Sequence, residues 1–157
     1  MHIHFEQLVQ EHEGRIRQIA RRFAARGAVD DLVQDILMRL WRSLPGFRGE
    51  ARIETWIYRV ALNAAMTSLK ESIRDRELLA ALTASSEIPQ NEAPGANPAD
   101  VLSSFMNGLG DIDASVLMMY LDGLAADDMS AVLGISANAI NVRINRLKQK
   151  FSDTYVE

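Results

Sequence analysis

A stretch poor in apolar residues divides this chain of 157 residues into two parts. Residues 83–97 consist largely of small and polar side chains, interrupted by Pro89 and Pro94, and Pro98 follows directly. Such a segment has too little apolar surface to pack, and its prolines interrupt regular structure, so it predicts a flexible linker. We therefore expect two small domains, residues 1–82 and 99–157, joined by a linker at residues 83–98.

Both parts carry apolar residues at helical spacing, and no segment shows the alternation that is typical of strands. The expected fold class is all-α. The first part predicts a helix over residues 3–26, which Gly27 closes, a second from Asp30 to Pro45, and a third from about residue 53 to 82. The core stripe expected of the second helix consists of Val33, Ile36, Leu37, Leu40, Trp41 and Leu44.

The third predicted helix has more faces than a single packed side needs. Trp56 falls on the core side with Ile53, Ile57, Val60, Ala61 and Ala64, so we assign it to the core. A polar stripe about 100° away holds Arg52, Arg59, Asn63 and Lys70. Tyr58, Leu62 and Leu69 form an apolar strip opposite the core. A helix packed between two neighbours, with solvated arginines beside it, would also explain this pattern.

The last part of the chain has the layout of a helix-turn-helix. A first helix is predicted from Ala126 to Leu133, Gly134 makes the turn, and Ser136 caps the second helix. One side of that second helix is apolar, through Ile140, Ile144, Leu147 and Phe151. The opposite side and its flanks carry Asn138, Asn141, Val142, Asn145, Arg146 and Gln149.

This arrangement favours DNA binding over a helical hairpin with solvated amides. Asn and Gln side chains suit adenine edges in the major groove, and nearby cations suit phosphates. The candidate phosphate contacts are Arg143, Lys148 and Lys150. The charge distribution also favours DNA binding. Residues 83–157 have only 4 basic side chains against 10 acidic ones, but all four basic side chains are clustered within residues 143–150.

Composition excludes several other classes of protein. The chain has no cysteine, which excludes disulfides and thiolate metal sites and fits a reducing compartment. His12 lies on the core stripe of the first helix, so we expect a packed histidine and no metal site. No apolar run approaches the roughly 18 residues of a membrane span. Without a triad, metal cluster or phosphate loop, we expect a cytoplasmic protein that is not an enzyme and has no cofactor, small-molecule substrate or membrane partner.

Three segments together resemble bacterial RNA polymerase sigma factors of the extracytoplasmic-function (ECF) group. DDLVQDILMRLWRSL and FRGEARIETWIYRVALNAA resemble the family's second conserved region. LDGLAADDMSAVLGISANAINVRINRLKQKF resembles its fourth region, the promoter-reading helix-turn-helix. With the first helix and the linker, the resemblance extends over nearly the whole chain, and it is stronger in the first domain.

The resemblance implies a role for each surface of the first domain. Asp31, Gln34, Asp35 and Met38 would dock on the clamp helices of the polymerase β′ subunit. The loop from Phe47 to Glu54 is similar to the family's specificity loop, which captures a base of the minus-ten element. Phe47, Arg48, Gly49, Arg52, Arg59, Asn63 and Lys70 would form this minus-ten site. The strip of Tyr58, Leu62 and Leu69 is a candidate surface for an anti-sigma factor.

The second domain would bind the minus-thirty-five element of promoter DNA and the polymerase β flap. Its DNA-contacting residues would be Ser136, Asn138, Asn141, Val142, Arg143, Asn145, Arg146 and Lys148. Asn141 stands where the family usually has a basic residue, so the family's role does not transfer to it. Two alternatives remain open: a sigma-like decoy that binds an anti-sigma factor without reading DNA, and a dimeric helix-turn-helix regulator.

Overall fold

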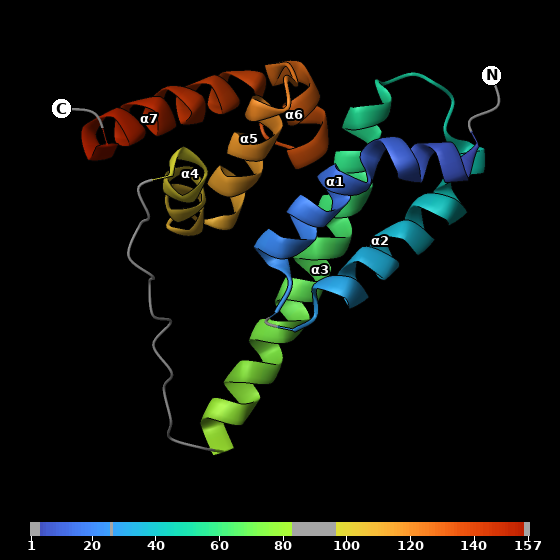
Figure 1. Ribbon diagram of the computed structural model, residues 1–157, viewed down its shortest axis with the longest axis horizontal. Helices are drawn as coiled ribbons and strands as arrows, with labels where there is room; N and C mark the ends of the chain where they lie inside the picture. Colours follow the sequence, from blue (N-terminus) through green and yellow to red (C-terminus); the bar gives the residue numbers. More distant parts are fainter. Residues whose placement is uncertain (1–3, 26, 83–96, 156–157) are drawn as a thin grey trace. The chain divides into compact units, whose positions relative to one another are not determined.

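The computed structural model describes residues 4–25, 27–82 and 97–155, with residues 68–82 as backbone alone. Contacts divide the chain into two compact units, Met1–Pro89 and Gln90–Glu157. Every regular element in the described ranges is helical (Figure 1), so the prediction of an all-α fold is confirmed. The predicted linker at residues 83–98 lies, except for its last two residues, outside the described part of the chain.

The first unit is built around one long helix. It contains α1 (Phe5–Phe23), α2 (Val29–Ser43), a 3-10 turn at Leu44–Gly46, and α3 (Ile53–Leu82). The first part of α3 packs against both α1 and α2 (Figure 1). The core between the three helices includes Leu8, Ile16, Ile19, Phe23, Ile36, Leu40, Ile57 and Ala61.

Packing on two sides explains the several faces of α3. The sequence prediction places Tyr58 and Leu62 opposite the core, as a candidate surface for an anti-sigma factor, but they are 1% and 3% exposed. That prediction is wrong, because α3 has a neighbour on each of two sides and its second apolar side is also buried in the domain. The side chain of Leu69 lies outside the described residues. The helix therefore corresponds to the simpler alternative of packing between two neighbours.

Trp41 is a further residue that the periodicity misplaced. It was predicted to lie in the core stripe of α2, but its side chain is 62% exposed. Leu32, Val33, Ile36 and Leu40 bury the side of α2 that meets α1 and α3. Trp41 comes seven residues after the exposed Gln34 and so falls within about 20° of it, outside that side.

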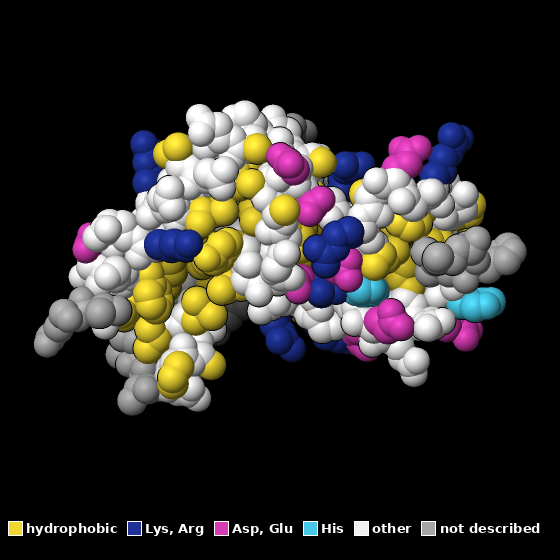
Figure 2. Space-filling model, turned by 90° about the horizontal axis from the view of Figure 1, so that it is seen from above, with side chains coloured by type: hydrophobic (Ala, Val, Ile, Leu, Met, Phe, Trp, Pro, Cys, Tyr) yellow, Lys and Arg dark blue, Asp and Glu magenta, His cyan; other side chains and the backbone are white. Residues whose placement is uncertain are grey.

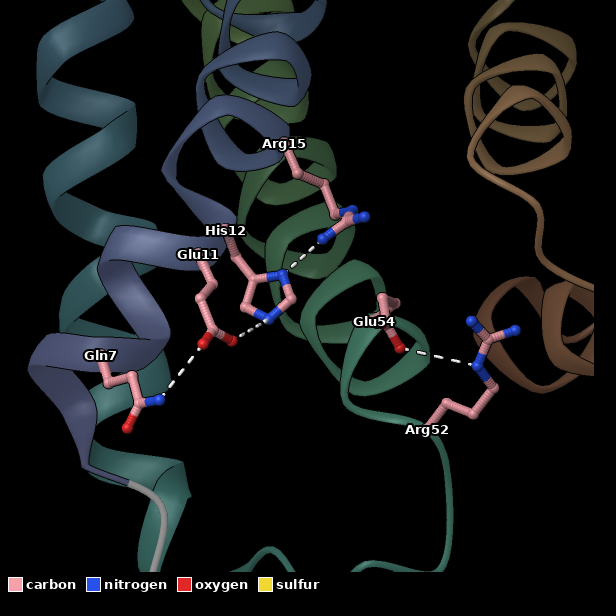
Figure 3. Close-up of polar contacts among 6 residues, drawn as sticks. All are labelled: Gln7, Glu11, His12, Arg15, Arg52 and Glu54. Carbon is pink, nitrogen blue, oxygen red and sulfur yellow. Dashed lines mark hydrogen bonds and ion pairs between the residues drawn. The ribbon is translucent and has the colours of Figure 1, made fainter.

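Polar contacts also hold the first unit together. Arg17 of α1 donates hydrogen bonds to Glu13 and to Asp30 at the start of α2, and these contacts raise the pKa of Arg17. His12 is buried, as predicted, and a guanidinium N–H of Arg15 donates to its Nδ1 (Figure 3). Its Nε2 lies 3.9 Å from Glu11. The described residues contain no group of side chains that could hold a metal ion.

The second unit consists of α4 (Pro98–Asn107), α5 (Asp111–Leu121), α6 (Ala126–Leu133) and α7 (Ala137–Tyr155). Asn97 caps α4 by accepting a hydrogen bond from the amide of Ala99 at 3.1 Å. Helix α7 packs against α5 and α6. Among the described helices, none combines the length and hydropathy needed to cross a bilayer.

Candidate nucleic-acid interface

The loop that enters α3 is anchored at one end by an aromatic pair. Phe47 is half-buried, and its ring centroid lies 5.0 Å from that of Trp56, which is 9% exposed. The assignment of Trp56 to the core is therefore confirmed. Arg48 and Gly49 are exposed beyond this anchor, and Gly49 has a φ of +76°, a conformation that side chains rarely adopt. The loop thus has a fixed base and an open tip.

A polar stripe runs along α3 beside this loop. Arg59 and Asn63 are exposed and lie four residues apart, so they share one side of the helix. Thr67 donates a hydrogen bond at 2.8 Å to the backbone carbonyl of Asn63. Arg52 lies just before the helix, with its Nε 3.6 Å from a carboxylate oxygen of Glu54 (Figure 3). The Lys70 side chain lies outside the described residues.

The outer side of α2 forms a second surface of the first unit. Asp31 and Gln34 are exposed, and Met38 is 51% exposed. Asp35 accepts a hydrogen bond from Arg39 at 3.1 Å. Trp41 lies on the Gln34 side of this surface, three residues after Met38. We call Asp31, Gln34, Asp35, Met38 and Trp41 the α2 surface.

Sequence reasoning missed Trp41 as a member of the α2 surface. Its angle held the necessary signal, because Trp41 comes seven residues after the exposed Gln34 and so falls within about 20° of it around the helix. Its large apolar area would gain free energy if a partner covered it.

The helix-turn-helix of the second unit forms as predicted. Its first helix, α6, begins at Ala126 and ends at Leu133, and Gly134 follows with a φ of +75°. The hydroxyl of Ser136 accepts a hydrogen bond from the amide of Ala139 at 3.1 Å, which confirms it as the cap of α7. Asp128 accepts a hydrogen bond from the amide of Ala125 and so stabilises the start of α6.

Helix α7 separates a buried side from an exposed amide side. Ile140, Ile144 and Leu147 are buried. The exposed side carries two kinds of group, amides and one branched apolar side chain that is 41% exposed. These residues, which we call the α7 outer face, are Asn138, Asn141, Val142, Asn145 and Gln149.

The four cations of α7 have different surroundings. Arg146 and Lys150 are exposed, and the exposed Lys148 places its Nζ 5.0 Å from the ring centroid of Tyr120. Arg143 differs, because its Nη1 lies 2.7 Å from Oδ1 of Asp113 in α5. Its guanidinium is thus engaged within the unit.

An apolar groove lies on the side of α7 that faces away from the amides. It has a volume of about 290 Å³. Figure 2 shows hydrophobic side chains gathered on the left of the view, over this unit. Helices α4, α5 and α7 line the groove, chiefly through Leu102, Phe105, Leu117, Leu121, Leu147 and Phe151. A partner in this groove would leave the α7 outer face free.

Comparison with known proteins identifies relatives of this chain. The Sigma-70 region 2 family model matches residues 8–74, which hold the α2 surface, the loop and the polar stripe of α3. The ECF RNA polymerase sigma-E factor of Haemophilus influenzae is 23% identical over 92% of this chain and 84% of its own length. The sigma-E factor of Escherichia coli is 25% identical over 92% of this chain and 83% of its own length.

The chain belongs to the ECF sigma factors. Solved structures agree with this assignment in fold. The sigma factor RpoE of Bartonella quintana, in complex with the anti-sigma factor NepR, matches with a TM-score of 0.77 and 18% identity over 95% of this chain and 94% of its own. CnrH, in complex with the cytosolic domain of CnrY, matches with a TM-score of 0.65 and 26% identity over 96% and 86%. As a sigma factor, the chain is a non-enzymatic factor of transcription initiation.

Proposed function

We propose that this ECF sigma factor directs core RNA polymerase to promoters through two separate DNA-reading surfaces, one in each unit. The observation that carries this proposal is the exposed Asn63 beside an anchored loop, inside the segment that matches Sigma-70 region 2. An amide next to an open loop suits the capture of an unstacked base. We assign residues 1–82 to core and minus-ten binding and residues 99–157 to minus-thirty-five binding, with residues 83–98 as the linker.

In the first unit, the α2 surface binds the β′ clamp helices. Its exposed carboxylates, amide and large apolar side chains combine the polar and apolar contacts typical of protein interfaces. Phe47, Arg48 and Gly49 form the base-capturing loop. Asn63 reads the base edge, while Arg52, Arg59 and Lys70 contact the DNA backbone.

In the second unit, the α7 outer face enters the major groove of the minus-thirty-five element. Arg146 and Lys148 contact phosphates, and their exposure supports this role. Ser136 positions the helix as its cap. Since Arg143 is paired with Asp113, we give it no phosphate contact. The β flap occupies the apolar groove, which lies away from the reading side.

We also propose regulation by an anti-sigma factor, in the cytoplasm. A sigma factor of similar fold was solved with the anti-sigma factor NepR, which supports such a partner here. Tyr58 and Leu62 do not take part in that contact, because they are buried within their own unit.

Run-off transcription tests the central proposal. The full chain and purified bacterial core polymerase are incubated with a pool of genomic promoter fragments, and the transcripts are sequenced. We expect initiation from a specific subset of fragments only when the chain is present. Failure to bind core and to initiate would contradict the sigma function. Binding to an anti-sigma factor without initiation would indicate a decoy instead.

Replacing Asn63 with alanine should relax specificity at one minus-ten base. A lost amide contact to a base edge costs about 1–3 kcal/mol at that position. Initiation from templates with each of the four bases at every minus-ten position measures the effect. Gln18→Ala, which removes an exposed amide from α1, is the matched control. A uniform loss across all base variants would show that Asn63 is structural.

Replacing Arg146 with alanine should weaken duplex binding at every sequence alike. One lost phosphate contact lowers the slope of log affinity against log salt by about 1. Titration of a labelled duplex at several salt concentrations measures this slope. Arg21→Ala, an exposed arginine of α1, serves as the control. An unchanged slope for the Arg146 variant would exclude a phosphate contact.

A further inference from the structure

In the first half of α7, the α7 outer face carries only amide side chains and one apolar side chain. Asn138, Asn141 and Asn145 are exposed, and they surround Val142, which is 41% exposed. Between Ala137 and Asn145 the only cation is Arg143. The base-reading half of α7 therefore consists of amides and one branched apolar side chain.

An ion pair with Asp113 holds the guanidinium of Arg143 away from the α7 outer face. Its Nη1 lies 2.7 Å from Oδ1 of Asp113, and the two side chains are 36% and 35% exposed. A charge-assisted hydrogen bond of this length, partly shielded from water, is stronger than one between neutral groups. The two residues come from α5 and α7, so the contact fixes the guanidinium toward the body of the unit.

The available groups match one kind of base pair. Guanine is read through its O6 and N7 acceptors by the paired donors of arginine or lysine. Adenine is read through N6 and N7 by the amide of asparagine, and the thymine methyl takes an apolar contact. The exposed face offers three amides and a valine, and Arg143, the one guanidinium between Ala137 and Asn145, is engaged with Asp113. The exposed Arg146, Lys148 and Lys150 supply charge for phosphates on the flanks and the later turns.

We propose that α7 reads A·T base pairs in the minus-thirty-five element, with adenine facing the asparagines and a thymine methyl against Val142. The proposal rests on the sigma function proposed above and specifies the duplex that its second unit selects. The Asp113–Arg143 ion pair maintains this preference, because it keeps the arginine from adding a guanine contact.

Base substitution in a holoenzyme tests this proposal. From a fragment that the full chain and core polymerase transcribe, each upstream base pair is replaced by the other three, and holoenzyme binding and transcript yield are measured. We expect a run of at least two A·T positions, each losing about 5- to 150-fold on change to G·C, the range of one bidentate contact. A preference for G·C throughout the element, or no preference, would overturn the proposal while leaving the sigma function intact. Failure to initiate from any fragment would contradict both.

Releasing Arg143 gives a second, independent test. Asp113→Asn removes the ion-pair partner, so we expect one position of the element to tolerate or prefer G·C several-fold more than before. Asp127→Asn removes one negative charge from the start of α6 and should leave every preference unchanged. Thermal unfolding of both variants establishes that they fold. An identical base profile for Asp113→Asn and the original chain would overturn the role assigned to the ion pair.

Discussion

Replacing Trp56 with alanine is expected to remove much of the stability of the first unit. The side chain is 9% exposed and packs against the ring of Phe47. It lies in the helix that contacts both α1 and α2. Truncation of a buried tryptophan costs about 3–5 kcal/mol through lost apolar burial and the cavity left behind. Because whole domains are stable by only about 5–15 kcal/mol, this loss is a large fraction of the total.

The same substitution should also release the loop that enters α3. Phe47 loses the ring that lies 5.0 Å away, so the fixed base of the loop is lost together with core packing. Chemical denaturation followed by circular dichroism, with peptide-resolved hydrogen exchange, measures the effect. Peptides of α1, α2 and α3 should exchange faster. Trp56→Phe, which retains an aromatic ring, should lose clearly less stability, and a cost below about 1 kcal/mol for alanine would show that the site is not a core position.

Local signals account for the parts of the fold that the sequence predicted well. The turn at Gly134 and the cap at Ser136 depend on a few adjacent residues. A left-handed φ favours glycine, and a backbone amide in the first turn of a helix can donate a hydrogen bond to a serine hydroxyl. The bounds of α6 and the buried side of α7 therefore follow from the chain itself. The same holds for Trp56, whose angle places it with Ile57 and Ala64.

Packing between distant segments determines features of the fold that helical periodicity does not predict. Whether Tyr58 and Leu62 are buried depends on how many helices surround α3, and a helical period gives only the angle between its faces. The contact between Asp113 and Arg143 joins residues 30 positions apart, so no local pattern predicts it. That contact engages the guanidinium of Arg143 within the unit, and in our proposal it leaves the other cations of α7 to DNA. The proposed reading surface thus depends partly on helix α5, outside the helix-turn-helix.

Trp41 contrasts with Trp56, although both are tryptophans of the first unit. Its 62% exposure means that alanine in its place should change the free energy of unfolding by no more than about 0.5 kcal/mol. From its place on the α2 surface beside Gln34 and Met38, we propose a different role for it. Tryptophan is among the residues most often found to dominate an interface, because covering its ring removes a large apolar area from water.

Trp41→Ala should therefore weaken binding to core polymerase by about 2–4 kcal/mol, or about 30- to 900-fold in Kd. Titration of labelled core with the full chain measures the affinity, and thermal unfolding of the same variant measures its stability. Ile112→Ala, which truncates an exposed apolar side chain of α5, is the control and should leave core binding unchanged. An unaltered affinity would remove Trp41 from the docking surface. A parallel loss of affinity and stability would instead make it a structural residue, so only weakened binding at full stability supports an α2 surface anchored by this ring.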